Sequence, residues 1–160
     1  LALPPDQIDA AIARDLTGDP VFGIFTTRRL EDFFPEERLA SARRNVEAIA
    51  GGTVLVYGVG ASLVCRGDVL ALADVTRWEI QLRFRRGIDN WRTARRGLGQ
   101  REKYKRGYFA EWRWADRVKD RLLPEMDLYL GGFGALNLLI RPEDLKNRDF
   151  SQVLGYWATS

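Results

Sequence analysis

The sequence predicts an α/β fold, an open and mostly parallel sheet covered by helices. Residues 53–57 and 68–74 are short apolar runs without regular polar alternation, which is typical of strands buried on both faces. Residues 127–130 form a third run of this kind. Segments with apolar residues at helical spacing separate the later runs. This alternation of strands and helices indicates parallel strands joined by right-handed crossovers.

Two helices are predicted before the first strand. Asp6 is a suitable N-cap for a helix whose apolar face contains Ile8 and Ile12. Thr27 is expected to cap a turn that follows. Pro35 suits the first position of a second helix, which two glycines end after about residue 50.

The later elements flank a basic connection at residues 87–99. Thr76 is expected to cap a helix over residues 77–86. Apolar residues at helical spacing predict a long helix over residues 107–123. A last strand at residues 135–140 and a short helix at 142–146 complete the expected order.

Residue content excludes several kinds of chemistry. The 160 residues are 46% hydrophobic and 29% charged, which suits one domain with its own core. Histidine is absent, so Ser-His-Asp and Cys-His catalysis are excluded, and with Cys65 as the single cysteine no metal site is expected. One cysteine without a leader-like N-terminus predicts a cytoplasmic setting. No apolar run approaches the ~20 residues that cross a bilayer, so no membrane partner is expected.

Positive charge is concentrated in one stretch. Residues 77–121 contain 15 Lys and Arg against 6 Asp and Glu, a net charge of +9, while the rest of the chain carries −6. A field of one sign attracts phosphates and other polyanions. The stretch is therefore where we expect a binding site.

A glycine-rich turn after the first predicted strand is the first candidate. Gly58, Gly60 and Ser62 would place backbone N–H groups at the carboxyl end of that strand, where open α/β sheets bind ligands. The alternative is a tight turn that needs glycine for its φ angles. The turn is not a Walker A loop, because its sequence pattern is absent from the chain.

Arginines after the second predicted strand are the second candidate. Arg83 and Arg86 share a helix face and, together with Arg77, are expected to lie over the glycine-rich turn and neutralise a phosphate held near Gly58 and Gly60. Asp74 and Glu79 are supporting residues, since Glu79 lies four residues before Arg83 and can hold its guanidinium group. A solvated face with ion pairs is the alternative.

Basic and aromatic residues alternate in a third region, in which Lys105, Arg106 and Arg113 are further supporting residues. Such interleaving, here with Arg101, Tyr104, Tyr108, Trp112 and Trp114, is also typical of single-stranded nucleic-acid binders. Glu111 is a candidate general base, with a merely solubilising role as the alternative.

These clusters, taken in order, resemble the kinase-like N-terminal portion of bacterial class I mannose-6-phosphate isomerase-type proteins. The resemblance covers roughly residues 19–130. The matching segments are residues 19–23, 30–34, 54–60, 68–74, 78–81, 104–109, 112–113, 115–117 and Lys119.

The resemblance implies a P-loop kinase-like fold of the uridine-kinase branch, without the Walker A strand. It implies a kinase-like domain over residues 1–130, followed by a C-terminal extension over residues 131–160. It also implies that the chain lacks the phosphate loop and the histidine-bearing cupin, so neither phosphoryl transfer nor isomerisation by the chain alone is expected.

The function predicted is recognition of a phosphorylated small molecule in phosphosugar or nucleotide metabolism. No cofactor is evident, although a nucleoside triphosphate with Mg²⁺ is compatible with the resemblance. The first alternative is a pseudo-kinase interaction module that packs on a partner such as a cupin isomerase. Nucleic-acid binding is the least favoured of the three.

Overall fold

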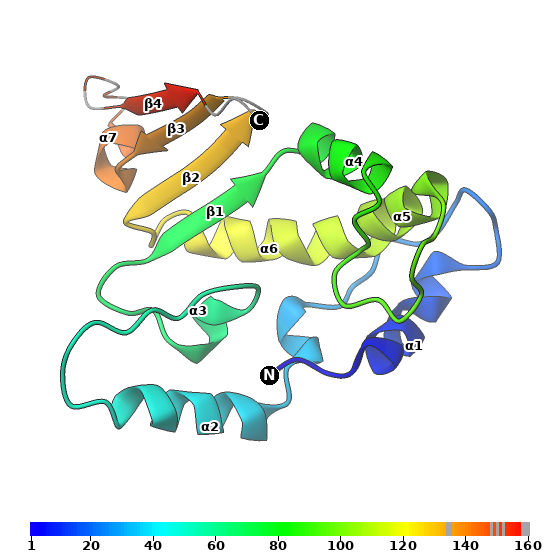
Figure 1. The fold of residues 1–160 in the computed structure, drawn as a ribbon, viewed down its shortest axis with the longest axis horizontal. Coiled ribbons are helices and arrows are strands. Elements are labelled where there is room, and N and C mark those ends of the chain that lie inside the picture. Colours follow the sequence, from blue (N-terminus) through cyan, green and yellow to red (C-terminus); the bar gives the residue numbers. More distant parts are fainter. Residues whose placement is uncertain (134–135, 148, 150, 152, 158–160) are drawn as a thin grey trace.

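The computed structural model describes residues 1–133, 136–147, 149, 151 and 153–157 (Figure 1). Its N-terminal part is helical. The helices there are α1 (Pro5–Leu16), the 3-10 turn η1 (Leu30–Phe33), α2 (Glu36–Glu47) and the single turn α3 (Ala61–Val64).

The rest of the chain combines helices with a sheet. The helices are α4 (Arg77–Arg85), α5 (Gln100–Arg106), the π-helical turn η2 (Gly107–Glu111), α6 (Trp112–Leu122) and α7 (Pro142–Lys146). The strands are β1 (Ala71–Val75), β2 (Leu128–Phe133), β3 (Leu136–Ile140) and β4 (Leu154–Trp157).

A mixed helix and sheet fold is confirmed, but the sheet is mixed and not mostly parallel. The strands lie in the order β1-β2-β3-β4. β1 and β2 are parallel, whereas β2–β3 and β3–β4 are antiparallel. Only two residues separate Phe133 from Leu136, too few for the crossover that a parallel pair needs. β3 and β4 therefore extend the parallel pair of β1 and β2 on the β2 side.

The predicted buried strand at residues 53–57 is wrong. This segment forms neither strand nor helix, and it is mostly exposed, with Leu55 78% and Tyr57 84% accessible. Among the described strands, β1 pairs with β2 alone, so no strand lies on the other edge of β1. An apolar run indicates that a segment can be buried, but it does not identify the surface that buries it.

Most of the other predicted elements form, with shifted ends. Thr76 caps α4 by accepting a hydrogen bond from the Glu79 N–H at 3.2 Å. Asp6 is not a cap, because α1 begins at Pro5 with Pro4 before it. The long helix begins at Gln100, seven residues before its predicted start, and runs through η2 into α6.

The core lies where the N-terminal helices meet α6. Ile8 and Ile12 of α1 pack with Phe33 of η1 and Trp114 of α6, and the rings of Phe33 and Trp114 meet edge to face at 4.7 Å. A second cluster of Leu70, Leu122 and Met126 lies between α6 and the sheet. Figure 1 shows α6 running between the helical part and the strands. α6 therefore joins the two halves of the core.

Buried charges hold α5 against its surroundings. The Arg106 side chain is 5% exposed and pairs with Asp9 of α1 and with Glu111 of η2, the latter at 2.7 Å. Its second terminal nitrogen donates to the Trp91 carbonyl at 3.1 Å. Lys103 is equally buried, and its ammonium group contacts Asp89 at 2.9 Å. Residues 87–99 are thus tied to α1, α5 and η2 at once.

The described part of the chain contains no helix that combines the length and apolar character needed to pass through a bilayer.

Candidate functional site

The glycine-rich turn lies against η1 and α2. Gly60 has φ +87° and precedes α3, and a Cβ atom there would lie 2.4 Å from Cζ of Phe34. Gly58 has φ +106° with open space around it. Ser62 lies in α3, a helix of four residues. The two glycines are explained by backbone conformation and by close packing on Phe34.

The arginines of α4 lie elsewhere. Figure 1 shows α4 above α6 and beside α5, whereas α3 and the turn before it lie below α6. Arg83 pairs with Glu79 at 3.0 Å, as the spacing predicts. Arg77 pairs with Asp116 and lies over the Trp112 ring at 4.7 Å. Arg86 is exposed at the end of α4. The structure therefore does not bring these guanidinium groups over Gly58 and Gly60.

Asp74 belongs to a polar cluster at the end of β1. Its carboxylate pairs with Lys119 of α6 and accepts a hydrogen bond from the Tyr129 hydroxyl at 2.8 Å. Burial acts to raise the pKa of Asp74, but these two hydrogen bonds outweigh it and hold the pKa below its usual value. The pKa of Lys119 is raised, because its hydrogen bonds to Asp74 and Tyr129 outweigh the opposing effect of burial. The cluster links β1, β2 and α6.

Arg106 and Glu111 are structural. The donors of Arg106 are occupied by the buried pairs described above. Glu111 accepts from Arg106 and from the Asn90 side-chain amide, the latter at 2.9 Å. Burial raises the pKa of Glu111 despite the nearby guanidinium group. Each carboxylate oxygen accepts from one of these partners and the side chain is only 12% exposed, so Glu111 is not placed to act as a general base.

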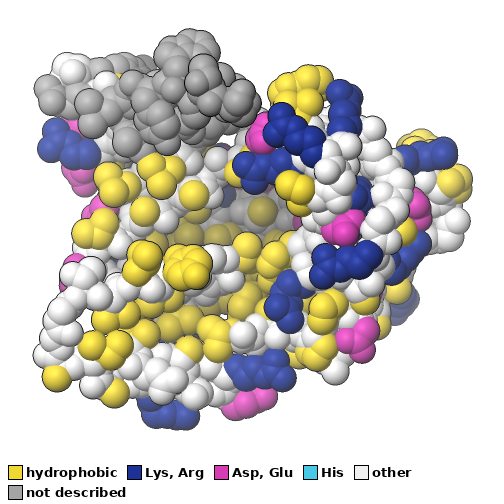
Figure 2. Space-filling model, in the orientation of Figure 1, with side chains coloured by type: hydrophobic (Ala, Val, Ile, Leu, Met, Phe, Trp, Pro, Cys, Tyr) yellow, Lys and Arg dark blue, Asp and Glu magenta, His cyan; other side chains and the backbone are white. Residues whose placement is uncertain are grey.

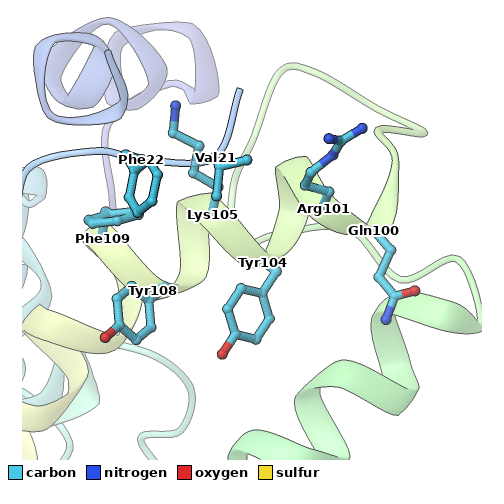
Figure 3. A pocket seen from close by; sticks show the side chains of 8 residues that line it. All are labelled: Val21, Phe22, Gln100, Arg101, Tyr104, Lys105, Tyr108 and Phe109. Atoms are coloured by element: carbon cyan, nitrogen blue, oxygen red, sulfur yellow. The ribbon is translucent and has the colours of Figure 1, made fainter. Parts of the chain in front are cut away.

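A pocket opens between α5 and the loop that follows α1 (Figure 3). Its volume is about 440 Å³. The residues that line it are Val21, Phe22, Gln100, Arg101, Tyr104, Lys105, Tyr108 and Phe109. Tyr104, Lys105, Tyr108 and Arg101 come from the basic and aromatic segment of the sequence. Val21, Phe22 and Gln100 were not predicted as site residues. The structure shows Val21 and Phe22 as exposed apolar residues close to Asp19 in the chain.

Two of the four aromatic residues that line this pocket are tyrosines with near-parallel rings. The rings of Tyr104 and Tyr108 are near parallel, at 11° with centroids 6.0 Å apart, and each residue is 38% exposed. Trp112 lies edge-on to both from the core side, at 5.0 and 6.1 Å. Arg113 lies over the Tyr108 ring at 5.5 Å. The two tyrosine rings thus pack against Trp112 on the core side and remain accessible to solvent on the other.

Two cations, Arg101 and Lys105, also line the pocket, and Figure 3 shows them on the side of α5 away from the tyrosine rings. Arg101 is exposed and makes no ion pair with the part of the chain that the structure describes. The Lys105 ammonium group donates to the backbone carbonyl of Asp19. The Asp19 carboxylate in turn accepts from the N–H groups of Val21 and Phe22, at 2.7 and 2.6 Å. These bonds from the two N–H groups hold the pKa of Asp19 below its usual value.

These contacts give the pocket a fixed wall and a free positive charge. The loop with Val21 and Phe22 is held by Lys105, and the guanidinium group of Arg101 remains available as a forked donor. No carboxylate lines the pocket. The arrangement suits a ligand that combines a flat ring with negative charge.

Replacement of the two glycines distinguishes a structural turn from a phosphate loop. Gly60→Ala should reduce the free energy of unfolding by about 2 kcal/mol or more, because it adds a clash with Phe34 to the strain of a positive φ. Gly58→Ala should cost only about 1–2 kcal/mol, since its surroundings are open. Urea titration measures both values. Equal losses would contradict the packing role, and a loss of phosphate affinity in two stable variants would restore the loop as a ligand site.

Comparison with known proteins identifies a family but not an activity. No curated protein and no solved structure matches the chain. A family model described as "Domain of unknown function (DUF8485)" matches residues 1–144, which include every residue of the pocket. The chain belongs to the DUF8485 family.

Proposed function

We propose that this chain is a phosphate-recognising domain whose ligand is a nucleotide, bound in the pocket of α5. The observation that carries the proposal is that a near-parallel pair of accessible tyrosines lines the same pocket as Arg101, a guanidinium group without an ion pair among the described residues. The sequence predicted a phosphate site at Gly58 and Gly60; the proposal instead places it at Arg101 on α5.

The base and the phosphate of a nucleotide each have a counterpart in the pocket. A base can stack on the face of Tyr104 or of Tyr108, a contact worth about 1–3 kcal/mol per base. The Arg101 guanidinium group can bind a phosphate through two parallel hydrogen bonds. Gln100 offers an amide with both donor and acceptor atoms for the edge of a base. A sugar phosphate without a base would use only the charged part of the site.

The kinase-like interpretation of the fold remains part of the proposal. It is supported by the parallel pair of β1 and β2 and by α4, which directly follows β1. The link to phosphosugar metabolism and the cytoplasmic setting rest on the sequence. Catalysis by this chain alone is not proposed, since the pocket offers no carboxylate as a general base.

Calorimetric titration at low salt tests this function directly. ATP and UTP, each with and without Mg²⁺, should release heat on binding, and mannose 6-phosphate should bind about tenfold more weakly because it has no base to stack. Tyr104→Ala and Arg101→Gln should each weaken nucleotide binding by about tenfold.

Matched variants outside the pocket provide the controls. Tyr57→Ala removes an exposed tyrosine and Arg14→Gln an exposed arginine, and neither should change the affinity. Absence of heat with both nucleotides would contradict the proposal, as would equal losses in the pocket variants and the controls.

A second candidate function is binding of a partner protein, which an exposed apolar surface favours. Figure 2 shows hydrophobic side chains gathered over the lower left of the molecule, where Figure 1 places the chain between α2 and β1. The large exposed apolar residues of this part, which we call the apolar surface, are Ile49, Val54, Leu55, Tyr57, Val59 and Val69. Large contiguous patches of this kind commonly mark protein interfaces.

The resemblance suggests a cupin isomerase as that partner. A purified class I mannose-6-phosphate isomerase cupin should form a complex with the chain in sedimentation velocity. Leu55→Asp should abolish the complex by placing a charge in the interface. Ile88→Asp, at an exposed apolar residue outside the apolar surface, should leave it intact. Sedimentation of the two proteins as separate species would rule out this partner, and self-association of the chain would assign the surface to a second copy.

A further inference from the structure

We infer that the ligand of the pocket is a segment of single-stranded nucleic acid, which extends from the tyrosines of α5 to the exposed tryptophan of α4. The inference rests on the proposed function, because it takes the same pocket as the place where the first base binds. It adds the length of the ligand and a second contact region.

The tyrosine pair offers more stacking surface than one base requires. Tyr104 of α5 and Tyr108 of η2 lie one helical turn apart and present two near-parallel rings at a centroid distance of 6.0 Å. Two accessible rings side by side can each take a base, as the aromatic platforms of single-strand binders do. A mononucleotide would leave one of these rings uncovered.

The second contact region lies on the neighbouring helix. α4 and α5 are in contact, and Figure 3 shows Gln100 and Tyr104 extending toward the side on which α4 runs. On α4, Trp78 is 56% exposed, and the Arg85 guanidinium group lies over its ring at 5.4 Å. A large exposed aromatic ring covered by a cation repeats the chemistry of the pocket one helix away.

Both helices also carry unpaired positive charge. Arg85 and Arg86 at the end of α4, and Arg101 at the start of α5, make no ion pair with any described residue. Most of the other cations of residues 77–121 are neutralised by carboxylates, for example Arg83 by Glu79 and Arg95 by Glu102. Three unpaired arginines suit a ligand with a phosphate at each step of a chain.

Single strands suit this surface better than a duplex. Stacking on tyrosine or tryptophan requires a base whose face is open, and the bases of a duplex cover one another. The contacts made are to base faces and phosphates, which all sequences share, so little sequence preference is expected.

The test is fluorescence anisotropy with labelled oligonucleotides, DNA and RNA in separate arms, of one, four, eight and twelve nucleotides. Affinity should rise at least tenfold between the mononucleotide and the eight-nucleotide strand, because further bases and phosphates become bound. It should fall on the order of tenfold between about 50 and 200 mM salt. A duplex of the same length should compete poorly.

Variants on α4 separate this inference from the function on which it rests. Trp78→Ala and Arg85→Gln should weaken binding of the eight-nucleotide strand about tenfold but leave mononucleotide binding unchanged. Circular dichroism verifies that each variant is folded, and Arg44→Gln, an exposed arginine on α2, is the matched control.

The outcomes are distinct. A mononucleotide that binds as tightly as the longer strands, or an eight-nucleotide strand that is indifferent to Trp78→Ala, would overturn the inference and leave the pocket as a mononucleotide site. Equal binding of duplex and single strand would also overturn it. Absence of binding by both mononucleotide and oligonucleotide would overturn the inference and the proposed function together.

Discussion

The position of α5 depends on one buried guanidinium group. Arg106 pairs with Asp9 of α1 and Glu111 of η2, and it donates to the Trp91 carbonyl in the connection of residues 87–99. Three segments far apart in the sequence thus meet at one side chain. Because a buried charge without partners is very costly, these contacts must form together. The Asp9 carboxylate extends the network by accepting from the Ala94 N–H at 3.0 Å.

This internal network explains how a basic stretch can carry an exposed aromatic surface. Lys103 and Arg106 point inward and are neutralised there, while Arg101, Tyr104 and Tyr108 lie on the outer side of the same helical segment. The π-helical turn η2 brings Gly107 against the Trp112 ring, which a Cβ atom would approach to 2.9 Å, and Trp112 in turn supports both tyrosines from the core side. The inner face of α5 therefore determines where its outer face lies.

Local signals in the sequence predicted local structure well. The Thr76 cap, the Glu79–Arg83 pair and the parallel strands around residues 71–75 and 128–130 are all confirmed, because each depends on residues close in the chain or on a strong apolar run. Two predictions were wrong: the buried strand at residues 53–57 and the proximity of Arg83 to Gly60. Both require knowledge of which distant segments become neighbours, and neither charge nor periodicity contains it. Part of the pocket could be predicted from the sequence, because Tyr104, Lys105 and Tyr108 belong to the basic and aromatic segment. Phe22 is distant in the sequence and lies beside them only in the folded chain.

The most direct test of this account is the stability of Arg106→Met, measured by urea titration together with amide hydrogen exchange. We expect the free energy of unfolding to fall by on the order of 3 kcal/mol, because Asp9 and Glu111 lose their buried partner, and amide exchange to become faster across residues 87–99. Arg95→Met, which removes an exposed pair with Glu102, is the matched control and should change stability by about 0.5 kcal/mol or less. A loss in Arg106→Met no larger than in the control, with unchanged exchange, would contradict the account.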